Sequence, residues 1–246
     1  MIIGGRYLTL GVMVFLIAFW EAVCRLFAVP AFILPSPARI VYTAVVQAPL
    51  LASHTMVTAV EILAGILVAL SVALPLATVM FAKPSVENAL APFLVASQAV
   101  PVFALAPLLV VWLGYGIAGK VIMAAIIIFF PITINLLEGF KSCSSEYRML
   151  FNLMGAGFWK RMRHLHWPWA LPYFFAGLKV GVSIAPIGAV IGEWVGAQRG
   201  LGFLMIQANA RLRVDLVFAA ILWLSAMGLT MWMLVGVLER RVVRWK

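Results

Sequence analysis

The chain has 246 residues, of which 65% are hydrophobic and only 11% are charged, and its mean hydropathy is +1.10. Soluble domains carry about 45–50% apolar and about 25% charged residues, so a soluble fold of this length could not bury so much apolar surface and the excess must face lipid. The net charge of +10 does not indicate a nucleic-acid-binding module, because the basic residues lie at the ends of apolar runs, as the positive-inside bias of membrane proteins predicts.

Six apolar runs are long enough to cross a bilayer as helices, since a span needs about 20 mainly apolar residues. They lie near Tyr7–Val29, Val57–Phe81, Leu90–Val111, Val121–Leu137, Leu171–Val195 and Leu216–Leu238. The runs are too long and too uniformly apolar to be barrel strands, which alternate between lipid and lumen. The first run resembles a signal peptide, but no small-x-small cleavage site follows it, so we expect it to be retained.

The third run is the least regular, because it is interrupted by Pro92, Pro101 and Pro107. The stretch Asn88–Gly119 contains no charged residue and is too long for one simple span. We expect one span over Leu90–Val111, followed by a turn at Gly114–Gly116.

An even number of spans places both termini on one side of the membrane. Eleven of the 18 Lys and Arg residues fall on that side, six fall on the other, and Lys179 lies inside a span. This bias predicts cytoplasmic termini. The outer segment Leu34–Arg39 is expected to feed a short helix ending near Gln47, and the cytoplasmic segment Lys141–Trp169 is long enough for two short helices. These positions argue against a disulfide between the two cysteines.

Ionisable residues inside spans indicate function by default. Lys179 lies eight residues into the fifth span, roughly 12 Å deep at 1.5 Å per residue; it snorkels, pairs with another helix or contacts substrate. Glu61 and Glu193 lie near outer ends, where interfacial hydration is the simpler interpretation. Small residues around Pro186 suit either a helix that lines a moving path or an ordinary kinked, packed helix. The candidate translocation path comprises Pro101, Lys179, Pro186 and Glu193.

Motifs for other chemistry are weak. Gly114–Lys120 matches the phosphate-loop spacing, but Val121 stands where the Mg²⁺-binding hydroxyl is required. His164 and His166 lie among basic residues, which disfavours a bound cation, so no metal site is predicted. No nucleophile motif or paired catalytic carboxylates are evident, and an intramembrane enzyme remains only as an alternative.

The strongest signal is the cytoplasmic stretch Glu146–Pro172. Its pattern predicts a short helix with apolar knobs, a Gly155–Gly157 turn, a basic amphipathic helix that includes Trp159–Arg163, and a proline-marked re-entry into the membrane. Such a knobbed helix fits a groove of a cytoplasmic partner. A helix lying on the lipid surface is the alternative.

This stretch resembles the loop of bacterial ABC importer permeases, which follows E-A-A-x-x-x-G-x9-I-x-L-P. Gly155 is in place, nine residues follow it, and Leu165–Pro168 corresponds to I-x-L-P, whereas Met149–Phe151 replaces E-A-A. Further stretches resemble permeases of the nitrate, sulfonate, taurine and pyrimidine group, and some are most similar to permeases for the hydroxymethylpyrimidine precursor of thiamine. The quoted stretches are Leu34–Pro37, Ala106–Leu108, Trp112–Gly116 and Ala176–Lys179, and, for the pyrimidine permeases, Ala185–Gly196, Gly200–Gly202 and Ala208–Arg211.

The resemblance implies an all-α integral membrane fold of six transmembrane helices, the ABC type I importer permease fold. Residues 1–53 would form the N-terminal helix and outer loop helix, residues 54–238 the permease core, and residues 239–246 a basic cytoplasmic tail. It also implies an inner-membrane, non-catalytic subunit working with a second copy of itself, two ATPase subunits and a substrate-binding protein. No cofactor is expected in this chain, since ATP and Mg²⁺ would bind the ATPases.

In such an assembly the cytoplasmic loop would transmit the ATPase motion to the spans. The residues carried over to this role are Met149, Leu150, Phe151, Leu153, Met154, Gly155, Gly157, Leu165 and Pro168. The implied substrate is a thiamine-precursor pyrimidine, with nitrate, sulfonate, taurine or a riboflavin-like compound as alternatives. A secondary transporter driven by an ion gradient is the alternative class.

Overall fold

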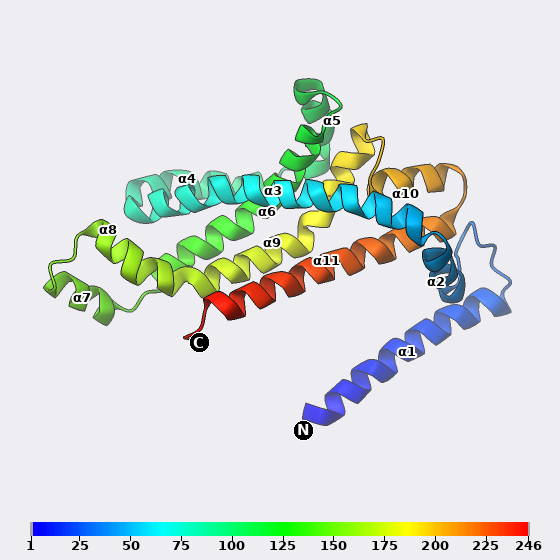
Figure 1. Ribbon diagram of the computed structural model, residues 1–246, viewed down its shortest axis with the longest axis horizontal. Helices are drawn as coiled ribbons and strands as arrows, with labels where there is room; N and C mark the ends of the chain where they lie inside the picture. The colour runs from blue at the N-terminus through cyan, green and yellow to red at the C-terminus, as the bar shows by residue number, and fades with distance from the viewer. Residues whose placement is uncertain (1, 246) are drawn as a thin grey trace. The chain divides into compact units, whose positions relative to one another are not determined.

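The computed structural model describes residues 2–245, and that part of the chain is helical and contains no strand (Figure 1). Its elements are α1 (Ile2–Leu26), α2 (Pro37–Val46), α3 (Ala48–Ala82), α4 (Pro84–Ser97), α5 (Val102–Leu113), α6 (Ile117–Lys141), α7 (Ser145–Leu153), α8 (Phe158–Arg161), a π-helical turn (Met162–His166), α9 (Trp167–Gly196), α10 (Leu201–Ala210) and α11 (Val214–Val242). The chain forms two compact units. One comprises the residues up to Val57 with Gln198–Ser225, and the other comprises Thr58–Ala197 with the residues from Ala226 onward. Lys246, at the end of the predicted basic tail, lies outside the described residues.

Among the described residues, four helical stretches are long and apolar enough to cross a bilayer: α3, α6, the continuous helix Phe158–Gly196, and α11. They contain, and so confirm as helical, the predicted runs Val57–Phe81, Val121–Leu137, Leu171–Val195 and Leu216–Leu238. The bent pair of α4 and α5 makes a fifth if it counts as one span. The first predicted span falls on α1, but the side chains of Tyr7 and the residues before it lie outside the described part, so the total of six stays a prediction.

The span predicted over Leu90–Val111 is not one unbroken helix, because α4 and α5 meet within it at an angle of 97°. The backbone N–H groups of Gln98–Val100 donate to carbonyl groups three residues back, at 3.0–3.3 Å, and this tightened turn ends α4. Pro101 then precedes α5 in an extended conformation, and it has no N–H with which to continue a helix. The bend therefore arises at one of the three prolines, while the other two remain inside helices.

The second predicted loop helix is not separate from the fifth span. Residues Phe158–Gly196 form one continuous helix of 39 residues, widened by the π-helical turn Met162–His166. Within that turn the N–H of Trp167 donates to the carbonyl group of Met162, five residues back. A proline ring clashes with the carbonyl group four residues earlier in a regular helix, so the wider turn accommodates Pro168. The proline thus marks a widened turn, not a break.

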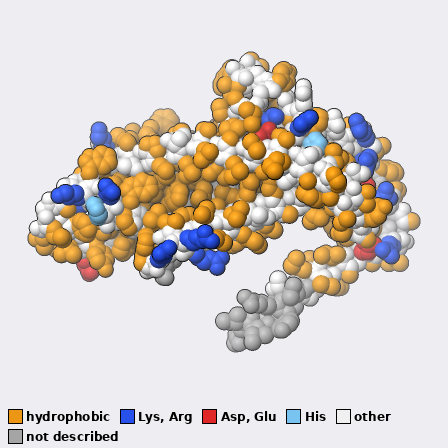
Figure 2. Space-filling model, viewed as in Figure 1, with side chains coloured by type: hydrophobic (Ala, Val, Ile, Leu, Met, Phe, Trp, Pro, Cys, Tyr) orange, Lys and Arg blue, Asp and Glu red, His pale blue; other side chains and the backbone are white. Residues whose placement is uncertain are grey.

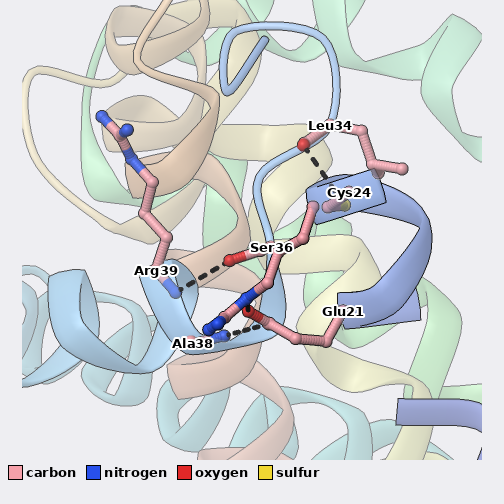
Figure 3. A network of polar contacts seen from close by, with 7 residues as sticks. Glu21, Cys24, Leu34, Ser36, Ala38 and Arg39 are labelled. Atoms are coloured by element: carbon pink, nitrogen blue, oxygen red, sulfur yellow. Dashed lines mark hydrogen bonds and ion pairs between the residues drawn. The ribbon is translucent and has the colours of Figure 1, made fainter. Parts of the chain in front are cut away.

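In the first unit, the link between α1 and α2 is fixed by side chains that bind the start of α2 (Figure 3). Ser36 Oγ accepts a hydrogen bond from the Arg39 N–H at 3.4 Å, and Glu21 Oε2 accepts one from the Ala38 N–H at 3.0 Å. Both acceptors satisfy N–H groups that a helix start leaves open. The short helix predicted to end near Gln47 is confirmed, since Gln47 is the C-terminal cap of α2.

The core of the first unit lies where α2, the start of α3, α10 and the start of α11 meet. It consists of Ala44, Leu51, Leu201, Leu204, Ala208, Leu216, Ala219 and Ala220. Four of these eight residues are alanines, whose small side chains let the helices approach closely.

In the second unit, α6 and α9 form an antiparallel hairpin (Figure 1). A methyl group added at Gly177 would meet the Pro131 carbonyl oxygen at 2.5 Å, and one added at Gly188 would meet the Ala124 Cα at 2.9 Å. The helices therefore approach more closely than any side chain at these positions would allow. A methyl group at Gly65 of α3 would likewise lie 2.7 Å from the Ala124 Cβ. The predicted close packing of the fifth span is confirmed, and the hairpin positions the segment at its tip.

Candidate functional site

The segment at the tip of the α6–α9 hairpin, residues 144–161, is named the arm; it contains α7 and α8 (Figure 1). After α7 the chain reverses at Gly155, which has a φ of +66°. The Gly155 N–H donates to the Asn152 carbonyl oxygen and the Ala156 N–H donates to that of Phe151, both at 3.0 Å. This pair of bonds ends a helix when the residue after it is left-handed, a conformation that glycine adopts without strain. The predicted turn is confirmed, and Gly155 is the residue that makes it.

The apolar side chains that the sequence predicts on one side of α7 are exposed to solvent. Met149, Leu150, Leu153 and Met154 are 50–81% exposed, and no residue of α7 is buried. Their spacing places them on one side of the helix. Of the other predicted loop residues, Phe151 is half-buried and Gly157 is exposed. A contiguous apolar surface in a polar segment is typical of a site that binds another protein or a membrane.

Leu165 and Pro168, predicted as part of the same loop, do not belong to this exposed surface. Leu165 is buried and Pro168 is half-buried, both where the arm joins α9. Beside them His166 is buried, with Nδ1 lying 3.3 Å from the Phe140 carbonyl oxygen and its ring centroid 4.6 Å from that of Phe81. The base of the arm is therefore packed into the helix bundle.

A hydrogen bond within the arm and an aromatic contact from the arm to α9 hold α7 in place. Arg161 of α8 donates a hydrogen bond to the Asn152 side chain at the end of α7. The ring of Tyr147 lies 5.6 Å from that of Trp169 at the start of α9. A displacement of α7 is therefore passed to α9 through packed side chains, rather than absorbed in a loose loop.

The four predicted path residues are not brought together. Pro101 lies in the exposed bend between α4 and α5, and Pro186 is buried within α9. Lys179 forms an ion pair with Glu239 of α11. Glu193 lies 14 residues further along α9, roughly 21 Å away at 1.5 Å per residue. The structure supports helix pairing for Lys179 and gives no single chamber that contains all four residues.

At the other end of the hairpin the second unit encloses a charge cluster, made of Thr58, Glu61, Lys120 and Glu193. Glu61 and Glu193 are each 1% exposed, so the interpretation that water hydrates them at an interface is wrong. Lys120 Nζ lies 3.1 Å from Glu61 Oε1, and the Thr58 hydroxyl donates to Glu193 Oε1 at 2.6 Å. Glu61 Oε2 is buried and has no hydrogen-bond partner among the described residues. Buried charges of this kind depend on their partners.

Sequence reasoning missed the partners of these ionisable residues. Glu193 and Thr58 are 135 positions apart, and Lys179 and Glu239 are 60 positions apart, so no local pattern links either pair. In the sequence, Lys120 was noted only as the last residue of the phosphate-loop spacing Gly114–Lys120. In the structure it forms an ion pair with Glu61. The available clue was the scarcity of charge inside apolar runs, because isolated charges in spans require partners.

Comparisons with known proteins agree on one family. The family described as "binding-protein-dependent transport system inner membrane component" matches residues 61–244. A probable ABC transporter permease protein of Haemophilus influenzae is 41% identical over 228 residues, which cover 93% of each chain. A riboflavin transport system permease of Chloroflexus aurantiacus is 40% identical, over 94% of this chain and 87% of the relative. A formylaminopyrimidine transport permease of Halalkalibacterium halodurans is 37% identical, over 94% and 92% respectively.

Proposed function

Because this chain belongs to the binding-protein-dependent transport system inner membrane components, we propose that it forms the membrane path of an ATP-driven importer and that its arm receives the motion of an ATPase partner. The observation that carries this proposal is the exposed apolar face of α7 at the tip of a closely packed hairpin. A partner that covers this face gains the burial of four large apolar side chains.

The arm has the mechanical properties that coupling needs. Its face is free to bind, its turn is held by Gly155, and its base is packed around His166 and Phe140. Motion applied to α7 would reach α9 directly, and α9 would carry it along the glycine-lined contact with α6. In this proposal Met149–Met154 dock, Gly155 sets the turn, and Trp159–Arg163 support the contact.

The experiment on coupling replaces Gly155. No atom lies within 4 Å of a Cβ atom added there, so the side chain of Gly155→Trp starts in open space. The left-handed backbone of the residue adds a strain of about 1–2 kcal/mol. We expect the variant to insert normally, with uptake and substrate-stimulated ATPase activity falling more than tenfold because the indole group obstructs the partner. Gly155→Asn is the matched control, since asparagine tolerates the left-handed conformation without the bulk. Normal uptake by the tryptophan variant would overturn the coupling role.

The assembly we propose contains two copies of this permease, two ATPase subunits that hold ATP and Mg²⁺, and a soluble substrate-binding protein outside. In this proposal both termini lie on the cytoplasmic side of a bacterial inner membrane, as the distribution of basic residues favours. The chain itself performs no catalysis in this arrangement. Its contribution is the path and the transmission of motion.

For the substrate we propose a small nitrogen heterocycle, with a thiamine-precursor pyrimidine as the first candidate. The support is the pair of relatives named for formylaminopyrimidine and riboflavin transport, at 37% and 40% identity. Relatives named for aliphatic sulfonate and taurine transport are 26% identical, which ranks those substrates, and nitrate, lower. The test is to purify the binding protein that associates with this permease and to identify its bound molecule by mass spectrometry. A bound sulfonate, taurine or nitrate would overturn the substrate proposal and leave the transport function intact.

The alternative class is an ion-coupled secondary transporter, and the buried carboxylates of Glu61 and Glu193 are the observation that favours it. Such a protein works without an ATPase. An ATPase that co-purifies with this chain and is stimulated by substrate supports the importer, whereas uptake driven by an ion gradient through this chain alone supports the alternative.

A further inference from the structure

The C-terminal end of α11 and the middle of α9 border a groove of about 730 Å³ in the second unit. We name it the tail groove. Its chemistry is set by Lys179, Trp232, Met233, Glu239, Arg240 and Arg244. Figure 2 shows basic side chains gathered where the C-terminal end of α11 lies. Neither the family assignment nor the proposed coupling gives this groove a role.

The charges of the tail groove do not balance. Lys179 is paired with Glu239, and its ammonium lies 5.7 Å from the centroid of the Trp232 ring. Arg240 and Arg244 are exposed, and within the described part of the chain neither forms an ion pair with a carboxylate. The Nε of Arg240 donates to the Gly236 carbonyl oxygen at 3.3 Å, which leaves the outer guanidinium nitrogens available. The groove thus presents two uncompensated guanidinium groups, which suit the bidentate binding of a phosphate.

The depth of these groups along α11 identifies the kind of molecule that fits. The apolar run of α11 ends at Leu238, and charged residues begin at Glu239, so the guanidinium groups lie where hydrocarbon gives way to lipid headgroups. Trp232 is eight residues before Arg240, roughly 12 Å deeper at 1.5 Å per residue. Trp232 and Met233 are both exposed at that depth. The groove is therefore cationic at its membrane-surface end, and at its deeper end the exposed Trp232 and Met233 lie beside the paired Lys179.

We propose that the tail groove is a binding site for an anionic phospholipid. The headgroup phosphate binds Arg240 and Arg244, and an acyl chain lies along Trp232 and Met233. A free phosphate ion would use only the cationic end, and a zwitterionic lipid would leave the net positive charge uncompensated. Basic pockets between helices at the cytoplasmic surface are suited to acidic lipid headgroups. This proposal is independent of the transported substrate and of the ATPase.

The experiment uses the full-length permease in detergent and native mass spectrometry with phosphatidylglycerol, phosphatidylcholine or inorganic phosphate. We expect phosphatidylglycerol to remain bound, with occupancy reduced roughly tenfold or more in Arg240→Gln/Arg244→Gln, since two charge-assisted contacts are lost. Arg241→Gln is the matched control, because Arg241 lies between the two arginines but does not line the groove. It should retain the wild-type occupancy. Because all three arginines are exposed, these variants are expected to fold.

Five results would overturn the proposal. Equal retention of phosphatidylglycerol by the wild type and the double variant shows that the lipid binds elsewhere. An equal loss in Arg241→Gln shows diffuse charge attraction rather than a site. Equal retention of phosphatidylcholine, or displacement of the lipid by inorganic phosphate alone, shows that the anionic lipid is not the ligand. A double variant that changes the oligomeric state at unchanged lipid occupancy shows that a second copy of the chain covers the groove.

Discussion

Replacing Lys120 with methionine is expected to destabilise the second unit more than any other single change of a lysine. The Nζ atom of Lys120 lies 3.1 Å from Glu61 Oε1, where Glu61 is 1% and the Lys120 side chain 13% exposed. At an effective dielectric constant of about 20, two unit charges at that distance attract by about 5 kcal/mol. Methionine preserves most of the volume, so the lost charge is the main effect.

The net loss is smaller than the bare attraction, because the wild-type pair has already lost its hydration. Removing one partner of a buried pair costs about 3–5 kcal/mol, since the other charge stays buried without compensation. Here Glu193, also 1% exposed, lies close enough to interact with Glu61, so the variant leaves two carboxylates together. We therefore expect a loss in the upper part of that range.

The assay is unfolding in mixed micelles of increasing SDS content, followed by tryptophan fluorescence. Lys83→Met is the control, because Lys83 is exposed and forms no ion pair among the described residues. The double variant Lys120→Met/Glu61→Gln removes both charges and should recover at least half of the lost stability. If Lys120→Met unfolds no more easily than Lys83→Met, or if the double variant is no more stable than Lys120→Met, the buried ion pair does not stabilise the second unit.

Two further predictions concern the hairpin and the base of the arm. Gly177→Ala places a methyl group 2.5 Å from the Pro131 carbonyl oxygen and should cost about 1–3 kcal/mol in the same assay; Gly11→Ala, with nothing within 4 Å, should cost nothing, and equal losses would contradict the close packing. Burial raises the pKa of the Cys143 thiol. Because the thiolate is the reactive form, iodoacetamide should modify Cys143 slowly at neutral pH. The rate should increase as the pH rises above the ordinary pKa of a cysteine thiol. Lys160→Cys in a Cys143→Ser background supplies an exposed cysteine for comparison. If iodoacetamide modifies this cysteine and Cys143 at equal rates at neutral pH, burial does not protect Cys143.

The positions of the long helices could be predicted from the sequence because the bilayer itself imposes their length and composition. Runs such as Val121–Leu137 needed no knowledge of neighbours, although α6 extends beyond both ends. The bend at Pro101 could not be placed, since three prolines interrupt the same run and only the tightened turn before Pro101 selects it. The prolines showed where the helix could be interrupted, but only the folded structure shows which of them ends it.

In the candidate site, too, local features could be predicted and long-range contacts could not. The turn at Gly155 was predictable, because a left-handed helix end is a local property of glycine. The burial of Leu165 was not, because a motif gives positions along the chain but no packing. The partners of Glu193 and Lys179 come from other helices, so only the folded structure reveals them.

An ATP-driven importer is distinguished from an ion-coupled transporter by uptake into proteoliposomes that contain this permease with its ATPase, the binding protein being supplied on the opposite side. We expect radiolabelled pyrimidine substrate to accumulate only when hydrolysable ATP reaches the ATPase side. We expect Gly155→Trp to abolish this accumulation and Gly155→Asn to retain it. Accumulation driven by an imposed proton or sodium gradient, with the permease alone and no ATPase, would contradict it.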